Sequence, residues 1–414
     1  MKYCLLILIS ALFLFSCGKE KTNLKPSFND TEVPDLGMTE KELYDKILGN
    51  LVGSAIGDAM GAPTEMWSRE NIQLEYGFVD GLDSMIREVS PEGIWIANLP
   101  AGGTTDDTRW KMLTNTYLLS QNQSELNSKD FAKHILNTYE GYVDEYSKIE
   151  GIDPEPFEAA ALKMGWLQEW AKVSQPFIDE NLIAYSDSLN KFYGGEMVCA
   201  GLLYAPSIGA YFPGNPEKAY QEAYKLSIYD LGYARDLTGL AAAMTSAGMK
   251  PGAIKENLLA ALRLDPQGYF ESRLVGRTAH KLLKEALFIT EESSRQDSLG
   301  NQLLPDSPSL QSAFAQLDLK QQDMPFHAGE IYLQMITAMI YADFDFMGTL
   351  IFLTNYGRDN DTTAAVAGGI LGAFYGFENL PKLEREKVLK VNREIQGIDL
   401  EKMASELTSH LIGK

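Results

Sequence analysis

Apolar residues recur at spacings of three and four along most of the chain, with polar residues between them. This spacing places the apolar side chains on one face of an α-helix, where a neighbouring element can bury them. Alanine and leucine are frequent in these stretches, and both favour helix. The pattern predicts helices over 43–59, 105–119, 131–142, 157–170, 197–211, 219–226, 234–247, 254–262, 275–287, 330–341, 346–354, 364–375 and 403–411.

Strand patterns and domain boundaries are scarce. The best alternating stretch is 93–97, and it is short. Two polar segments, 174–193 and 290–325, are expected to be loops or insertions. Neither divides the chain into halves, and no repeat of fixed period is visible. The sequence therefore predicts an all-α fold in one large helical domain.

The first residues have the character of a targeting signal. Lys2 precedes an apolar run over 5–15, which is too short to span a bilayer but has the length of a signal-peptide core. The run ends just before Cys17, and this junction resembles the lipobox of a bacterial lipoprotein. The alternative is a cleaved secretory signal in which the cysteine is accidental.

The lipobox interpretation implies a lipid anchor in the bacterial cell envelope, on a periplasmic or outer-membrane lipoprotein. The membrane is then reached only through the lipid on Cys17. Cys199 becomes the single cysteine of the mature folded part, so no intrachain disulfide is expected. The expected organisation is a signal peptide over 1–16, a tether over 17–37 and a catalytic domain over 38–414, which opens with a helix-capping pattern at Thr39 and Glu42.

Charge excludes one large class of partners. The 414 residues include 57 acidic and 36 basic side chains, so the net charge is −21. Binding to nucleic acid requires basic patches that neutralise phosphates, and none is visible. An acidic protein that handles anions needs metal ions or backbone N–H groups to do so.

The first chemical cluster runs from a glycine stripe to an acid. Gly53, Gly57 and Gly61 lie on one face of the predicted helix, so another backbone can approach closely there. Tight helix packing alone would also explain them. Glu65 follows on a loop just past the expected helix end.

Two further clusters each open a predicted helix with a hydroxyl and two carboxylates. Thr105, Asp106 and Asp107 begin one, and Asp359 and Asp361 with the following threonine begin the other. Helix capping explains either cluster alone. Two such elements about 250 residues apart indicate more, because hard oxygen ligands suit Mg²⁺ or Mn²⁺. Together they could hold two divalent cations.

In order and spacing, the three clusters resemble the ADP-ribosylglycohydrolase family. Its motifs G-D-x-x-G-x-x-x-E, T-D-D-T and G-x-D-x-D-T map onto 57–65, 105–108 and 357–362. The resemblance implies the all-α fold of that family, with an orthogonal arrangement of helices, and a dinuclear Mg²⁺ or Mn²⁺ site. Glu65 would lie near the metals, and Asp106 or Asp107 would help to activate water. The implied metal ligands are Thr105, Asp106, Asp107, Asp359, Asp361 and Thr362.

The phosphate-binding loop departs from the family pattern. The family usually has G-N-G-x-x-M-R, whereas this chain has Gly194 and Gly195 followed by Glu196, without the asparagine or the arginine. The two glycines could still offer N–H groups to a phosphate, and a plain turn before a helix is the alternative. Gly103, at the start of the second cluster, is grouped with them as a substrate contact.

The expected function is metal-dependent hydrolysis of an N- or O-ribosyl bond. ADP-ribosyl conjugates are the default substrate of the family, and a nucleoside or another small riboside is the alternative. A non-catalytic surface binding module and a different metal hydrolase, such as a phosphoesterase, remain open. None of the four histidines lies in a cluster, which argues against a histidine-based zinc site.

Overall fold

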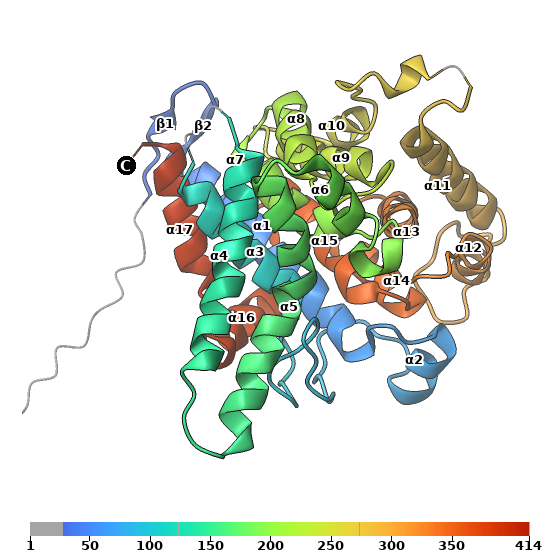
Figure 1. The fold of residues 1–414 in the computed structure, drawn as a ribbon. Coiled ribbons are helices and arrows are strands. Elements are labelled where there is room, and N and C mark those ends of the chain that lie inside the picture. The colour runs from blue at the N-terminus through green and yellow to red at the C-terminus, as the bar shows by residue number, and fades with distance from the viewer. Residues whose placement is uncertain (1–27, 122–124, 273, 414) are drawn as a thin grey trace, which may run out of the picture.

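The structure, a computed structural model, describes residues 28–121, 125–272 and 274–413 (Figure 1). The expected signal peptide, the lipidation residue Cys17 and the first part of the tether lie outside the described residues. Within the described ranges, no helix combines the length and apolar character needed to cross a bilayer.

Helices dominate the described chain, as the apolar spacing predicts. The α-helices are α1 (Glu40–Gly61), α2 (Arg69–Glu75), α3 (Asp106–Leu119), α4 (Ser128–Ser147), α5 (Pro154–Ile178), α6 (Leu182–Leu189), α7 (Ala205–Tyr211), α8 (Pro216–Leu226), α9 (Ala234–Gly248), α10 (Lys255–Ala261), α11 (Thr278–Ser294), α12 (Pro308–Asp318), α13 (Ala328–Tyr341), α14 (Phe346–Tyr356), α15 (Asn360–Tyr375), α16 (Lys382–Val391) and α17 (Leu400–Leu411). The all-α fold is confirmed.

Helices α1 and α15 form the centre of the fold, with the other helices around them (Figure 1). The glycine stripe of α1 lies against α15 so closely that side chains would not fit. A Cβ on Gly57 would lie 2.0 Å from the carbonyl oxygen of Ala364, and one on Gly61 would lie 2.4 Å from the Cα of Asp361. The stripe therefore packs a helix, and this packing holds the third cluster against the end of the first.

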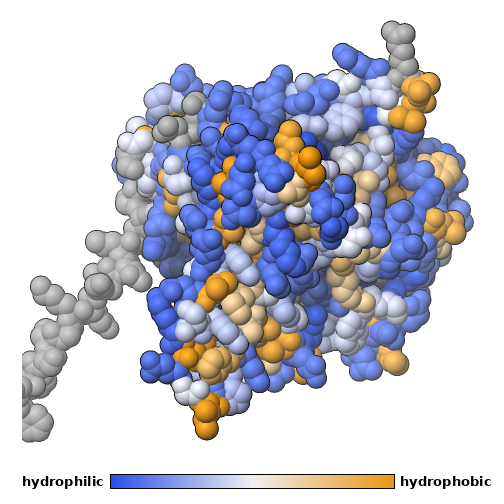
Figure 2. Space-filling model, in the orientation of Figure 1, coloured by the Kyte–Doolittle hydropathy of each residue, from blue (hydrophilic) through white to orange (hydrophobic). Residues whose placement is uncertain are grey.

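The remaining helices enclose this pair. Figure 1 shows α4 and α5 side by side as a hairpin, with α16 behind it, α17 to the left of α4, and α11 to α14 on the right. The visible surface is mostly hydrophilic, with scattered apolar side chains (Figure 2). This distribution fits a strongly charged chain that buries one large apolar core and a small second cluster.

Both segments expected to be loops contain helices. Segment 174–193 holds the end of α5 and all of α6, and segment 290–325 holds the end of α11 and all of α12. In α12, Leu310, Phe314 and Leu317 are buried at helical spacing. The Ser, Gln and Asp residues around this short apolar stripe conceal it in the sequence.

One helix expectation is wrong, because stretch 197–211 is not one helix. The short alternating stretch 93–97 contains no strand, in keeping with the all-α prediction. In stretch 197–211, Val198 instead forms an isolated β-bridge with His327. A 3₁₀ turn follows over Ala200–Leu203, and α7 begins only at Ala205, with Pro206 in its first turn. A proline is tolerated there because the first N–H groups of a helix lack partners in any case.

The last part of the predicted tether belongs to the fold. Strand β1 (Glu32–Val33) pairs antiparallel with β2 (Met38–Thr39), and Val33 is buried. Thr39 then caps α1 in a capping box with Glu42, as predicted. The fold of the described residues thus includes a strand before the expected boundary at residue 38, which the sequence does not predict because a two-residue strand is too short to produce a periodic pattern.

Candidate active site

The aspartate of the first cluster anchors the start of the second. Asp58, buried in α1, accepts hydrogen bonds from the backbone N–H groups of Thr105 and Thr108 at 2.9 and 3.0 Å. Their hydroxyls also donate to it, at 3.0 and 2.6 Å. Burial raises the pKa of the Asp58 carboxyl to about 7, and the nearby charge of Asp107 adds to the rise. The N-terminus of α3 is therefore fixed to α1 by one carboxyl group.

The first and third clusters are joined by their backbones. The Met66 N–H donates to the Arg358 carbonyl at 2.7 Å, and the Arg358 N–H donates to the Trp67 carbonyl at 3.0 Å. Met66 and Arg358 both have a left-handed backbone, with φ of 65°, which costs free energy for residues other than glycine. Such strain is typical of functional sites, and here it directs Glu65 and Asp359 toward each other.

Three carboxylates converge where these clusters meet. One oxygen of each of Glu65, Asp359 and Asp361 lies within 4.8 Å of the others. Asp361 Oδ2 accepts a hydrogen bond from the Thr105 hydroxyl at 3.2 Å. Its Oδ1 is buried and has no hydrogen-bond donor among the described residues. A buried oxygen without a donor is costly, and a bound cation would satisfy it.

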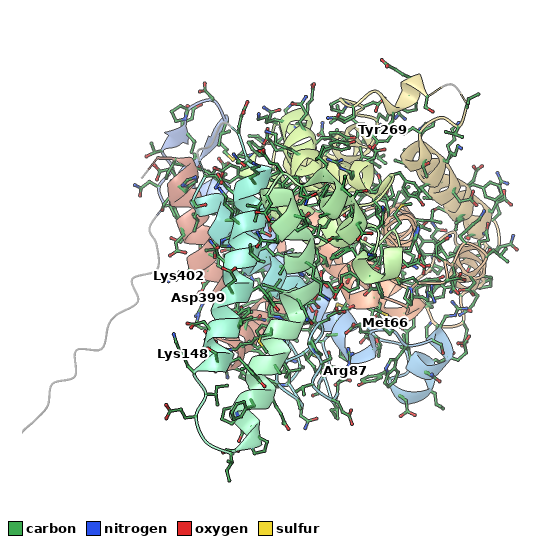
Figure 3. All side chains as sticks on the ribbon, viewed as in Figure 1. Met66, Arg87, Lys148, Tyr269, Asp399 and Lys402 are labelled. Atoms are coloured by element: carbon green, nitrogen blue, oxygen red, sulfur yellow. The ribbon has the colours of Figure 1, made fainter. Side chains whose placement is uncertain are left out.

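The pKa values of the buried aspartates also indicate a cation site. Burial raises the pKa of Asp359 to about 7, and burial together with the charge of Glu65 raises the pKa of Asp361. Arg87 holds Glu65 in place through a 2.6 Å ion pair. In Figure 3, Arg87 and Met66 lie on the same side of the molecule, at one end of the helical bundle. The three carboxylates thus fit a divalent cation, because buried like charges are stable only with a counter-charge.

The two aspartates of the second cluster have different surroundings. Asp106 lines the pocket above the three carboxylates, and burial together with the charge of Asp107 raises its pKa. Asp107 is not among the residues that line this pocket. It accepts hydrogen bonds from the Lys111 ammonium at 3.1 Å and from the Thr362 hydroxyl at 3.0 Å. Only Asp106 is therefore placed to meet a substrate or a water in the pocket.

The pocket itself is small, acidic and aromatic. Its volume is about 80 Å³, well below the roughly 300 Å³ at which drug-sized ligand pockets begin. The described residues that line it include no lysine or arginine. They are Glu65, Met66, Glu92, Asp106, Trp170, Tyr193, Val198, Cys199, Ala200, Leu203, Phe326, Asp359, Asp361 and Thr362.

Comparisons with known proteins agree with this geometry. The sequence profile of the ADP-ribosylglycohydrolase family matches residues 39–413, nearly all of the described chain. The chain belongs to the ADP-ribosylglycohydrolase family. The description of that family names a glycohydrolase that acts on ADP-ribosyl groups.

Individual relatives of this ADP-ribosylglycohydrolase family member add less detail. A solved structure titled "ADP-ribosylglycohydrolase-related protein complex" matches with a TM-score of 0.51 and 20% identity, over 89% of this chain and 99% of that one. That likeness shows the fold alone. "Uncharacterized protein YegU" of Escherichia coli (strain K12) is 47% identical over 36 residues, which are 9% of this chain and 11% of the relative. This match spans about a tenth of the relative's length.

The structure brings the predicted acidic and hydroxyl residues of the family motifs together. Thr105 and Asp106 open α3, Asp361 and Thr362 open α15, and Asp359 precedes α15. The predicted glycine contacts lie elsewhere. Gly194 and Gly195 have positive φ in an exposed turn, and Gly103 packs so closely on Leu99 that a Cβ would lie 2.6 Å from the Leu99 Cβ. None of the three lines the pocket.

Sequence reasoning missed the opposite wall of the pocket. Glu92 lies there, and Arg109 fixes its loop by donating to the carbonyls of Glu92 and Gly93 at 2.7 and 2.9 Å. Burial raises the pKa of Glu92, and Tyr193 opposes that rise. Tyr193 has an unusual left-handed backbone, with φ of 44°. Neither residue belongs to a motif, so the only signal was composition: an acid in a glycine-containing loop and a tyrosine before two glycines.

Proposed function

We propose that the protein is a metal-dependent hydrolase that cleaves an N- or O-ribosyl bond of an ADP-ribosyl-type conjugate. The observation that carries the proposal is the convergence of Glu65 with the buried Asp359 and Asp361 at the pocket. The Asp361 oxygen without a donor supports it further. A loss of these carboxylates would be expected in a protein that kept the fold only as a binding module.

The cation in this proposal is Mg²⁺ or Mn²⁺, held by Glu65, Asp359 and Asp361. The remaining hydroxyl and carboxylate groups of the clusters, such as Thr362 and Asp106, lie beside them. When bound, such an ion supplies Lewis-acid chemistry, orienting hydroxyls and lowering the pKa of water. Oxygen ligands alone favour these hard cations over zinc.

Side chains of the protein are proposed to accept the proton of water and to stabilise the charge of the sugar. The Asp106 carboxylate, in the pocket next to the three carboxylates, is proposed to accept the proton of the attacking water. Cleavage of a ribosyl bond passes through a cation-like sugar, and the surrounding carboxylates stabilise that developing charge. Glu65 is proposed to contribute to this stabilisation, in the orientation that its ion pair with Arg87 maintains.

A second candidate substrate class is a small riboside without a pyrophosphate. The pocket favours this class, because its described lining offers no basic side chain to a phosphate and its volume is small. Glu92 adds a further carboxyl group to one wall. Within the proposed activity, a nucleoside-like substrate would use the aromatic wall formed by Trp170, Tyr193 and Phe326.

The test is a metal-supplemented hydrolysis screen of the purified full-length protein. ADP-ribosyl conjugates and small ribosides are incubated with Mg²⁺, with Mn²⁺ or with EDTA, and release of the free sugar product is measured. The proposal expects turnover of at least one class with a cation, and none with EDTA. Turnover that is unchanged by EDTA would remove the metal from the mechanism, and hydrolysis of phosphate esters alone would replace the proposed reaction.

We also propose that the protein is anchored to the bacterial cell envelope by a lipid on Cys17. The apolar run over 5–15 and the cysteine that follows it support this proposal. The proposed partners are then a riboside or ADP-ribosyl conjugate and, through the lipid alone, a membrane.

A further inference from the structure

A buried lysine pairs with one aspartate of the second cluster. Lys111 lies one turn after Asp107 on α3, and its ammonium is 3.1 Å from Asp107 Oδ1. The two side chains are 2% and 1% exposed. A charge this deeply buried is stable only when it is paired, so Lys111 and Asp107 neutralise each other inside the protein.

Both oxygens of Asp107 are already in use. Oδ1 accepts from Lys111, and Oδ2 accepts from the Thr362 hydroxyl at 3.0 Å. Asp107 is also not among the residues that line the pocket, whereas its neighbour Asp106 is. The carboxylate that the family resemblance implies as a metal ligand is therefore engaged by a positive charge that the chain itself supplies.

The other carboxyl that holds the start of α3 is satisfied by hydrogen bonds. Asp58 accepts four of them from Thr105 and Thr108. Asp58 and Asp107 therefore both have partners inside the protein. Glu65, Asp359 and Asp361, on the other side of the site, are left as the group that needs a cation.

We infer that the Lys111 ammonium takes the place of a second divalent cation, so that the centre binds one cation, at Glu65, Asp359 and Asp361. The inference rests on the metal site proposed above and departs from the two cations that the family resemblance implies. A second divalent ion on Asp107 would have to displace the ammonium and leave a lysine unpaired in the interior. The repulsion between the two positive charges would oppose it further, since screening is weak in a buried site.

The test counts the ions. Full-length protein is stripped with EDTA and equilibrated with Mn²⁺, and bound manganese is measured by elemental analysis and electron paramagnetic resonance. The wild type is expected to bind one ion per chain, with the spectrum of an isolated Mn²⁺. Lys111→Met is expected to bind two ions whose spectra are coupled, because two-metal sites place their ions about 3.5–4 Å apart.

Lys46→Met is the matched control. Lys46 is another largely buried lysine, on α1, and it donates to the backbone carbonyls of Gly248 and Phe374 away from the site. This variant is expected to bind one ion. Two ions in the wild type, or one in a folded Lys111→Met variant, would overturn the inference and leave the proposed function standing. No bound ion in the wild type would overturn both. If Lys111→Met does not fold, the wild-type count still decides.

Discussion

The strongest evidence for a bound cation is a single oxygen atom, Asp361 Oδ1. It is buried and has no donor among the described residues, while Oδ2 of the same carboxyl is held by Thr105. The hydrogen bond to Oδ2 fixes the orientation of the carboxyl group, and Oδ1 is left free for a ligand. Replacement by asparagine preserves the shape of the side chain and removes its charge.

We expect Asp361→Asn to lower turnover by more than about 100-fold, since loss of groups that merely support metal ligands already costs 10–100-fold. Steady-state kinetics at saturating Mg²⁺ measures the effect. Asp343→Asn is the control, because Asp343 is exposed and pairs with Lys255 far from the pocket. Equal activity of Asp361→Asn and Asp343→Asn would contradict the assignment of Asp361.

The titration of Asp359 gives a prediction about pH. Burial raises its pKa to about 7 in the folded protein, whereas an unfolded aspartate titrates near pH 3.9. A raised carboxyl pKa means that the folded state binds more protons between these values, so stability is present at low pH and lost as pH rises toward 7. In EDTA, the melting temperature should fall from pH 5 to pH 8.

Saturating Mg²⁺ should remove most of this fall, because the ion stabilises the ionised carboxylates of the folded state. Thermal melts across this pH range, with EDTA and with Mg²⁺, make the comparison. A melting temperature that rises with pH in EDTA would contradict the assigned pKa shifts.

At the scale of elements, the sequence predicts helices well where the apolar stripe is long. Helices α3 and α9 begin and end within a residue or two of the predicted ranges. Shorter elements escape prediction. Helix α12 has a stripe of only three turns inside a polar segment, and β1 with β2 has two residues in each strand. Such elements depend on tertiary contacts more than on local pattern.

The close contact of α1 with α15 makes Gly57 a sensitive position. A methyl group there would meet the Ala364 carbonyl at 2.0 Å, and the two backbones would have to separate. We expect Gly57→Ala to lower the free energy of unfolding by about 1–3 kcal/mol, the usual cost of overpacking. Chemical denaturation measures this loss.

Gly81→Ala serves as the comparison, because a Cβ at Gly81 has no atom within 4 Å. That variant should match the wild type within about 0.5 kcal/mol. A Gly57→Ala variant as stable as Gly81→Ala would mean that α1 and α15 are not packed as closely as described.

At the scale of the whole molecule, the sequence predicts that two clusters about 250 residues apart meet. Each cluster lies at the start of a predicted helix and contains the same types of oxygen ligand. The sequence could not predict which carboxylates remain available. That depends on the pairing of Lys111 with Asp107, which the i,i+4 spacing in the predicted helix allows but does not require. It also depends on Thr362, which reaches Asp107 from α15. The Glu92 wall depends likewise on Arg109, which fixes a loop outside every motif.

The proposed anchor is also a property of the whole chain. Cys17→Ala should release the protein from the membrane fraction, or block its processing, without unfolding the domain. Membrane fractionation combined with circular dichroism measures both. A Cys17→Ala variant that still requires detergent for extraction would contradict the lipid anchor and leave the rest of the account unchanged.

The central claim is that a divalent cation binds where the three clusters meet, and anomalous X-ray diffraction from crystals grown with Mn²⁺ tests it most directly. The account predicts a manganese peak in contact with carboxylate oxygens of Glu65, Asp359 and Asp361, beside the pocket that Asp106 lines. A peak only at other sites, or no peak at saturating Mn²⁺, would contradict it and remove the basis for a metal-dependent hydrolase.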